Sequence, residues 1–301
     1  MIGEYALEPE MIAAWCTDHY KCKFFKNQFG TAQGRLPSRY PKRWGKKVWD
    51  AFADGSDMDK TRLTELLIRL QETMVKRKDI TWDENATWLE NAVREHGRHP
   101  FSAILARNNT KNIPGIICEA DTDPPCPDWD KTHGISVGRN VLEMVEAVKS
   151  MLLCCRWVKF VDPYISPGRP DYRPSLEAFL KILADERPVG LPNFIEIHTG
   201  LHDATETFLK EKYIQIIPDG LSVTLYQWEA RPNDQELHNR YILTDIGGVA
   251  FLHGLDISKR NNSKDDIFRL TRDQYDLRCE QYNPEKPAFE QAANPIIITK
   301  T

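Results

Sequence analysis

The sequence has 301 residues, 41% of them hydrophobic, with 40 basic and 44 acidic side chains and a formal net charge of −4. This length and apolar content predict two domains with hydrophobic cores of their own. No run of about 18 apolar residues occurs and no cationic and then apolar leader is present, which argues against a membrane span and a secretory signal. Seven thinly spread cysteines favour free thiols, so we expect a soluble, cytoplasmic protein.

The N-terminal third of the chain is predicted to be mainly helical. Residues 62–71 place leucines at the three-and-four spacing of a half-buried helix, which Asp57 or Asp59 would cap. Residues 82–93 repeat this pattern and begin with carboxylates, which favour a helix start. No strand is predicted in this part of the chain.

A polar, proline-rich segment over residues 108–134 predicts the domain boundary, because prolines sustain neither a helix nor a central strand. We therefore predict a mainly helical domain over residues 1–134 and a second domain over residues 135–301. The prolines of this linker are Pro114, Pro124, Pro125 and Pro127.

Residues 20–49 form a basic segment with nine cations and no acidic residue, so the rest of the chain is acidic. Its cations alternate with aromatic side chains, a mixture that nucleic-acid surfaces use for phosphate neutralisation and base stacking. Equally, the aromatic side chains would form core and the cations a solvated face. The side chains predicted to contact a nucleic acid are Lys42, Arg43, Lys46 and Lys47.

Residues 135–301 alternate predicted helices with predicted strands. This order is typical of an α/β fold with a partly parallel central sheet, in which ligands bind beyond the carboxyl ends of the strands. Asp162 and His198 fall at such ends, so we expect them near one site. The predicted helices are 138–153, 175–184 with Ser175 as cap, and 203–213, and the predicted strands are 157–164, 194–199 and 221–228.

The strongest functional clue is a predicted hairpin that carries His238, Arg240 and Asp245. Side chains two apart on a strand share a face, so His238 and Arg240 would point the same way. A neutral imidazole is a nucleophile or base, a guanidinium binds phosphate oxygens, and a carboxylate orients an imidazole or pairs with a cation. The alternative is a solvated hairpin with incidental polar residues.

Residues 238–256 resemble the His-x-Lys-x(4)-Asp signature of the phospholipase D superfamily and the small-residue segment that follows it. The resemblance covers roughly residues 138–300 and implies a mixed sheet flanked by helices. It also implies that His238 is a nucleophile forming a phosphohistidine, that position 240 binds phosphate, and that no metal is required. Members of the superfamily include nucleases and restriction enzymes, which favours a role in bacterial anti-phage defence, and also relatives that only bind.

The motif departs from the family pattern in three respects. Arg240 replaces a lysine, and its planar fork is not a point charge. The glycine arrives two residues late, at Gly254, and the motif is present once although the family's full site takes a histidine from each of two halves. A symmetric homodimer would supply the second histidine, so we expect a dimer. His253 is either a second polar group of the site or a satisfied core histidine.

The predicted function is a metal-independent phosphodiesterase, most simply a nuclease that binds DNA or RNA. The alternative is a catalytically inactive binding or adaptor module for a protein partner from the same system, a nucleic acid or a phospholipid headgroup. Cys16, His19 and Cys22, with Cys118 or Cys126, would offer four zinc ligands, but their spacing is not that of a standard finger. We therefore predict no cofactor and no metal.

Overall fold

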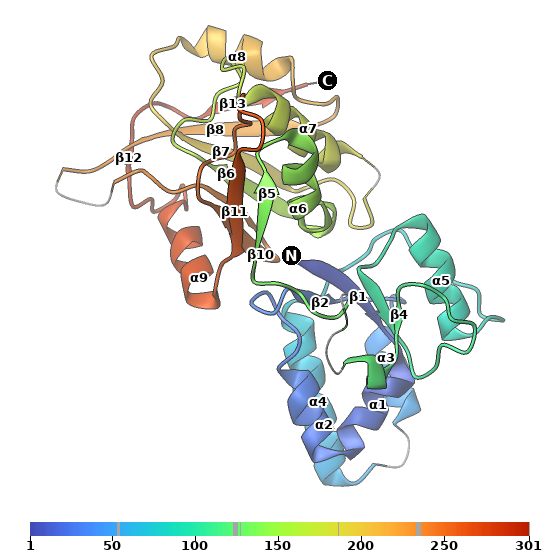
Figure 1. Cartoon of the computed structure of the whole chain (residues 1–301). Coiled ribbons are helices and arrows are strands. Elements are labelled where there is room, and N and C mark those ends of the chain that lie inside the picture. The colour runs from blue at the N-terminus through green and yellow to red at the C-terminus, as the bar shows by residue number, and fades with distance from the viewer. Residues whose placement is uncertain (53–54, 123–125, 127, 186, 233–235, 301) are drawn as a thin grey trace. The chain divides into compact units, whose positions relative to one another are not determined.

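The computed structural model describes residues 1–52, 55–122, 126, 128–185, 187–232 and 236–300. The chain divides into an N-terminal unit, residues 2–132 with 188–190, and a C-terminal unit, Met1 with residues 133–187 and 191–301 (Figure 1). Pro124, Pro125 and Pro127 of the predicted linker lie outside the described residues. None of the described helices is long and apolar enough to cross a membrane.

The N-terminal unit contains a sheet of four parallel strands, whereas the sequence had predicted a mainly helical domain. The strands are short and wholly buried, so they show none of the apolar and polar alternation that marks a half-exposed strand. Their order in the sheet is β2-β1-β3-β4. The strands are β1 (Gly3–Leu7), β2 (Arg35–Pro37), β3 (Ala103–Leu105) and β4 (Ile116–Ile117).

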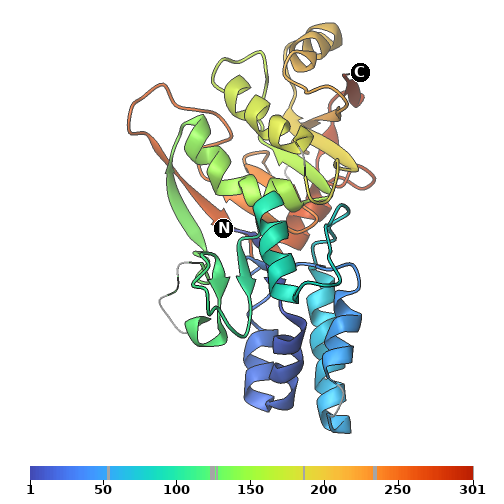
Figure 2. The same cartoon turned by 90° about the vertical axis from the view of Figure 1, so that its right-hand side faces the viewer.

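Helices cover both faces of this small sheet. Tyr5 and Leu7 of β1 pack into one apolar core with four helices, and Ala6 packs into a second core with Trp88 and Ala92 of the fifth. Figure 2 shows that fifth helix, in teal, apart from the blue helices. The helices are α1 (Pro9–Thr17), α2 (His19–Lys26), α3 (Trp44–Ala51), α4 (Asp57–Glu72) and α5 (Trp88–Arg98), and a 3-10 turn spans Glu119–Thr122.

Capping residues set where two of these helices begin. Ser56 caps α4 and Asp59 completes its capping box, so the predicted helix over 62–71 lies inside a longer one. Thr87 forms the same box for α5, and the helix therefore begins at Trp88 and not at residue 82. Both boxes bond the free backbone N–H groups of a first turn.

The C-terminal unit is built on a mixed sheet flanked by helices, as predicted. Strands β6, β7 and β8 run parallel, and β9, β10, β11 and β5 extend the sheet by antiparallel pairing. The order is β12-β8-β7-β6-β9-β10-β11-β5, and β13 also pairs with β8. The strands are β5 (Gly134–Gly138), β6 (Trp157–Val161), β7 (Phe194–Gly200), β8 (Ser222–Glu229), β9 (Tyr241–Thr244), β10 (Gly247–Phe251), β11 (Lys264–Arg269), β12 (Glu290–Gln291) and β13 (Ile296–Thr299).

Side chains of β6 alternate between the two faces of this sheet. Phe160 stacks on Phe179 of α7 on one face, whereas Val161 packs with Tyr282, just beyond α9, on the other. Figure 1 shows α6 and α7 together and α9 apart from them. The helices are α6 (Val141–Cys154), α7 (Arg173–Ala184), α8 (Glu206–Ile214) and α9 (Arg272–Gln281).

Ser175 does not cap α7, although the sequence had predicted that it would. The helix begins two residues earlier, at Arg173, and the Ser175 hydroxyl is buried, where it donates to the carbonyls of Tyr172 and Leu255. Ser175 therefore ties α7 to the segment that follows β10.

Candidate functional site

Four strand ends meet at one edge of the large sheet, which we call the site edge. Because β9 runs antiparallel to β6 and β10, the start of β9 lies beside the ends of both, at the pairs Val161 with Tyr241 and Tyr241 with Ala250. The start of β11 lies at the same edge because β11 is antiparallel to β10. The predicted residues Asp162, His238, Arg240 and His253 all belong to this edge.

His238 and His253 flank the paired part of β9 and β10 at the site edge. Residues of this pair match as Tyr241 with Ala250, and the backbone bond from Phe251 N to Arg240 O extends the pairing one step toward the edge. His238 lies two residues before Arg240 and His253 two residues after Phe251, each outside its strand. Both histidines therefore belong to the site edge.

A buried carboxylate orients the His253 ring. Asp265, whose side chain is fully buried, accepts at Oδ1 from His253 Nδ1 (3.1 Å) and from the backbone N–H groups of His253 and Leu252. A carboxylate only accepts, so Nδ1 carries the proton and Nε2 holds the free lone pair. The ring itself is 56% exposed, which leaves Nε2 available to a ligand. His253 is therefore a fixed, accessible base.

His238 is held more loosely. Its Nε2 lies 2.7 Å from Glu236 Oε2, and both side chains are mostly exposed. The neighbouring Leu237 packs in the core that contains Trp228 and Tyr241. The imidazole therefore projects into solvent from an anchored backbone.

Two arginines at the site edge keep buried donors without partners. Arg240 donates from Nη1 to Leu252 O (3.4 Å) and lies over the Tyr164 ring, but its buried Nε has no partner among the described residues. Arg139, just after β5, pairs with Asp256 at 2.6 Å and also has an unpartnered buried Nε. Buried donors are almost always bonded, and a guanidinium N–H group bonds phosphate and carboxylate oxygens well, so these two groups are suited to an anion.

Asp162 holds two backbone segments of the site edge in place. It is wholly buried, and its oxygens accept from the backbone N–H groups of Tyr164 (2.9 Å) and Leu255 (3.0 Å) and from the Tyr172 hydroxyl. Burial raises the pKa of Asp162, whereas these N–H groups and the Arg240 charge act to lower it. Asp162 therefore positions the Tyr164 and Leu255 backbones and does not face solvent.

The segment after β10 turns sharply at Gly254, where φ is +148°. A Cβ there would lie 2.7 Å from Asp256 Oδ1 and 3.1 Å from Asp162 Oδ2. Only glycine fits both this backbone conformation and this close approach. The glycine stands two residues later than in the family motif, but it still permits a tight turn at the site edge.

Asp245 lies away from the other two motif residues. It follows the last residue of β9, whereas His238 and Arg240 precede the first. Its carboxylate accepts from Arg156 N (2.6 Å) and Arg156 Nε (2.7 Å) at the start of β6. The structure thus gives Asp245 a cation as partner, not an imidazole, and this contact fixes the hairpin to β6.

His198 is buried, and it belongs to a row of linked polar side chains that crosses three strands. Lys159 Nζ lies 2.9 Å from Glu196 Oε2, the same oxygen lies 3.0 Å from His198 Nε2, and Trp228 Nε1 donates to His198 Nδ1 (3.0 Å). Since Nδ1 accepts, Nε2 carries the proton of a neutral ring. Burial lowers the pKa of His198 and outweighs the raising effect of Glu196. Both nitrogens are occupied, so His198 has no lone pair for a ligand.

The lowered pKa of His198 predicts a loss of stability in acid. The unfolded chain takes up a proton near the ordinary histidine pKa of about 6.5, whereas the folded chain does so only at lower pH. The stabilisation is complete above about pH 6.5 and falls by up to about 1.4 kcal/mol per pH unit below it. Urea unfolding between about pH 7.5 and about pH 5.5 measures how the free energy of unfolding changes with pH. This pH dependence should be weaker in His198→Gln than in the wild type, and an equally strong dependence would contradict the assignment.

The basic segment belongs to the N-terminal unit, and most of its aromatic side chains are core. Phe25, Phe29, Tyr40 and Trp44 are buried, whereas Phe24 and Trp49 are partly exposed. The four predicted contact cations are separated: Lys42 and Arg43 are exposed, Lys46 pairs with Asp50, and Lys47 lies over the Trp82 ring. Lys42 and Arg43 are therefore the members best placed to meet a phosphate backbone.

The described residues contain no group of three or more histidine, cysteine, aspartate or glutamate side chains that could hold a metal ion. Cys16 and Cys22 are buried and hydrogen bonded to one another, which lowers the pKa of Cys22 to about 7. They belong to the core of the N-terminal unit together with Trp15 and Phe25.

No protein-family model matches this chain, and a search of curated proteins finds no match either. The resemblance to the phospholipase D superfamily thus depends on the motif residues alone. The sequence had not singled out Asp265 or Arg139, because each reaches the site edge from an element distant in the chain. Nor had it singled out Tyr164, two residues after Asp162. An acidic pair near the start of β11, Asp265 and Asp266, was the available signal.

Proposed function

We propose that the site edge cleaves phosphodiesters, and that the protein is a nuclease. The observation that carries this proposal is the presence at the site edge of two exposed histidines, His238 and His253, together with the unpartnered Nε of Arg240. Two imidazoles and a guanidinium are what an in-line displacement at phosphorus needs: a nucleophile, a proton donor and a charge stabiliser.

The reaction follows from these positions. His238 attacks phosphorus through a ring nitrogen, the bond to the leaving oxygen breaks, and protonated His253 gives that oxygen its proton. A phosphohistidine results. His253, now neutral, takes a proton from water, the water oxygen attacks phosphorus, and the bond to His238 breaks. Asp265 stabilises the His253 cation, and Arg240 and Arg139 neutralise the charge on the phosphoryl oxygens.

This proposal is tested by incubating the protein in EDTA with single-stranded and double-stranded DNA, with RNA and with bis(4-nitrophenyl) phosphate. Cleavage in EDTA is expected, because the site edge supplies its own nucleophile and acid. Quenching in base should preserve a phosphoenzyme that acid destroys, as a nitrogen–phosphorus bond requires. No cleavage of any of these substrates would leave the binding module as the function.

The binding module is the second candidate, and one contrast favours it. The partner of His238, Glu236, is itself exposed, whereas the partner of His253 is buried and fixed. A nucleophile whose partner is exposed is less preorganised than a base whose partner is buried. In this alternative the arginines hold a phosphate and no bond breaks.

The source of the second imidazole separates a single-chain site from the expected homodimer. In a single chain His253 is the acid, and His253→Ala should lower turnover by about 10² or more. If a second copy supplies its own His238, the His253→Ala variant stays active and the active species sediments as a dimer. Loss of activity in a monomer would therefore assign the acid to His253.

We expect the basic segment to contribute to nucleic-acid affinity. Neutralising two exposed cations, in the double variant Lys42→Gln with Arg43→Gln, should weaken duplex binding and reduce the slope of log affinity against log salt by about 0.9 per lost contact. Binding measured by fluorescence anisotropy at several salt concentrations checks this. Lys60→Gln, which removes an exposed cation already paired with Asp57, is the matched control. An unchanged slope in the double variant would contradict the contribution.

A further inference from the structure

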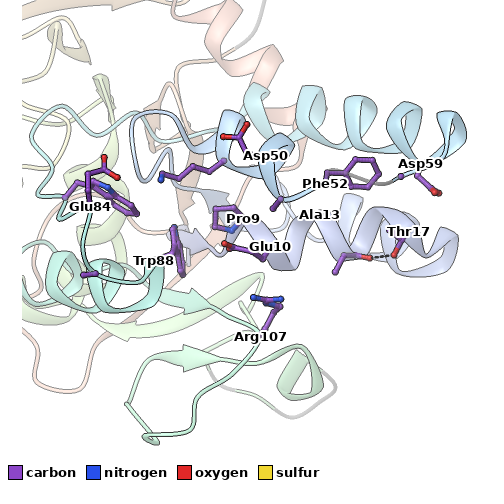
Figure 3. Close-up of a pocket in the computed structure, with 16 residues that line it drawn as sticks. Pro9, Glu10, Ala13, Thr17, Asp50, Phe52, Asp59, Glu84, Trp88 and Arg107 are labelled. Atoms are coloured by element: carbon purple, nitrogen blue, oxygen red, sulfur yellow. Dashed lines mark hydrogen bonds between the residues drawn. The ribbon is translucent and has the colours of Figure 1, made fainter.

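A cavity of about 790 Å³ opens in the N-terminal unit at the carboxyl ends of its parallel strands. Its walls come from the start of α1, from α3, from the segment before α5 and from the residues after β3. Figure 3 shows Glu10, Trp88 and Arg107 converging on one space from three of these elements. This volume is within the range of about 300–1,000 Å³ that is usual for small-molecule sites.

The cavity lies where the strand order of the sheet reverses. In the order β2-β1-β3-β4, the chain passes outward from β1 in one direction to β2 and in the other to β3. Glu10 follows β1 and Arg107 follows β3, so the two sides of the cavity flank this point. In open parallel sheets a ligand crevice forms at such a switch point, because the loops after the two strands turn away from one another.

Three polar atoms of the cavity lining are buried without a hydrogen-bond partner among the described residues. They are Glu10 Oε2 and the indole nitrogens Trp82 Nε1 and Trp88 Nε1. Buried donors and acceptors are almost always hydrogen bonded, so three unpartnered ones in one cavity point to a ligand that bonds them. That ligand must donate to a carboxylate and accept from N–H groups.

The charges and rings of the lining narrow the ligand further. Lys47 lies over the Trp82 ring (4.6 Å from its centroid), and Glu8 holds Arg107 at the rim. These two cations suit a phosphate, and Trp88, together with the part of Trp82 that Lys47 does not cover, offers an apolar wall for a flat heterocycle. The lining also carries Asp50, Asp59, Glu84 and Glu10, so a ligand with few negative charges fits better than a polyphosphate.

We propose that this cavity binds a purine nucleotide with a single phosphate. The base lies against the indole rings, Glu10 accepts from an N–H of the base or from ribose hydroxyls, and the phosphate meets Lys47 and Arg107. The site is independent of the proposed cleavage at the site edge, because all of its residues belong to the N-terminal unit.

Isothermal titration calorimetry of the full chain with AMP, GMP and inorganic phosphate tests this proposal. Saturable binding of at least one nucleotide is expected, at least about tenfold tighter than binding of inorganic phosphate. Equal affinity for phosphate and nucleotide would mean that the cavity binds only through its cations, and it would overturn the proposal. The absence of saturable binding would overturn it as well. An oligothymidylate with one internal purine distinguishes a free nucleotide from a base within a strand.

Two variants assign the binding to this cavity. Glu10→Gln should weaken nucleotide binding by about tenfold, because an amide replaces one acceptor oxygen by a donor. The matched control Glu177→Gln removes an exposed carboxylate of the C-terminal unit, outside this lining, and should leave the affinity unchanged. Ala14→Leu, at an exposed position of α1, should also block binding by filling the cavity. Unaltered affinity in both Glu10→Gln and Ala14→Leu would refute the proposal.

Discussion

His238→Ala is expected to lower phosphodiester cleavage by a factor of about 10³ or more while leaving affinity for the uncleaved substrate within a few fold. Among the described residues of the site edge, His238 and His253 carry exposed imidazoles, and His253 is already held by Asp265, so no neighbour replaces His238 as nucleophile. Because the side chain projects into solvent, its removal should cost little stability. Turnover in EDTA and binding by anisotropy measure the two quantities separately.

The control for this experiment is His19→Ala, which removes an exposed histidine of the N-terminal unit. It should leave both turnover and affinity unchanged. Residual cleavage by His238→Ala at more than about a tenth of the wild-type rate would contradict the nucleophile assignment. In that event Glu236→Gln is the informative variant. If a group other than His238 is the nucleophile, replacing Glu236, which is the partner of His238, should not change the rate of cleavage.

The sequence predicted the C-terminal unit better than the N-terminal one, and strand length is the reason. The strands β6, β7 and β8 are five to eight residues long and alternate with helices, so their apolar runs are recognisable. In the N-terminal unit, β2, β3 and β4 have three, three and two residues. Runs this short carry no period, and only tertiary pairing defines them as strands.

Within the candidate site, the sequence could identify residues near one another in the chain but not their distant partners. His238 and Arg240 were predicted from spacing alone, and both lie at the site edge. Asp265 contacts His253 across the β10 and β11 pairing, which no local pattern encodes. Asp245 shows the opposite case. It belongs to the same hairpin as His238 and Arg240, but it lies at the other end of β9.

The cavity of the N-terminal unit depends even more on topology. Glu10 and Arg107 are almost a hundred residues apart in the chain, and only the parallel pairing of β1 with β3 makes them neighbours of one space. Lys47 was predicted as a nucleic-acid contact because it belongs to a cationic run. The structure places it over Trp82 in this cavity lining, a position that the cationic run alone did not indicate.

Arg77→Met is expected to destabilise the N-terminal unit by about 3–5 kcal/mol, the usual cost of breaking a buried ion pair by removing one partner. The guanidinium donates to both oxygens of Glu4 (2.9 and 2.8 Å) and to Glu95 Oε1 (2.9 Å), and all three side chains are almost fully buried. Methionine retains much of the volume but leaves two carboxylates without their shared cation. Urea unfolding measures the loss, with the exposed neighbour Lys76→Met as control.

The size of this loss is itself the test of the buried ion pair. A loss below about 1 kcal/mol at neutral pH would contradict this expectation, because it would mean that the two carboxylates find other partners when Arg77 is removed.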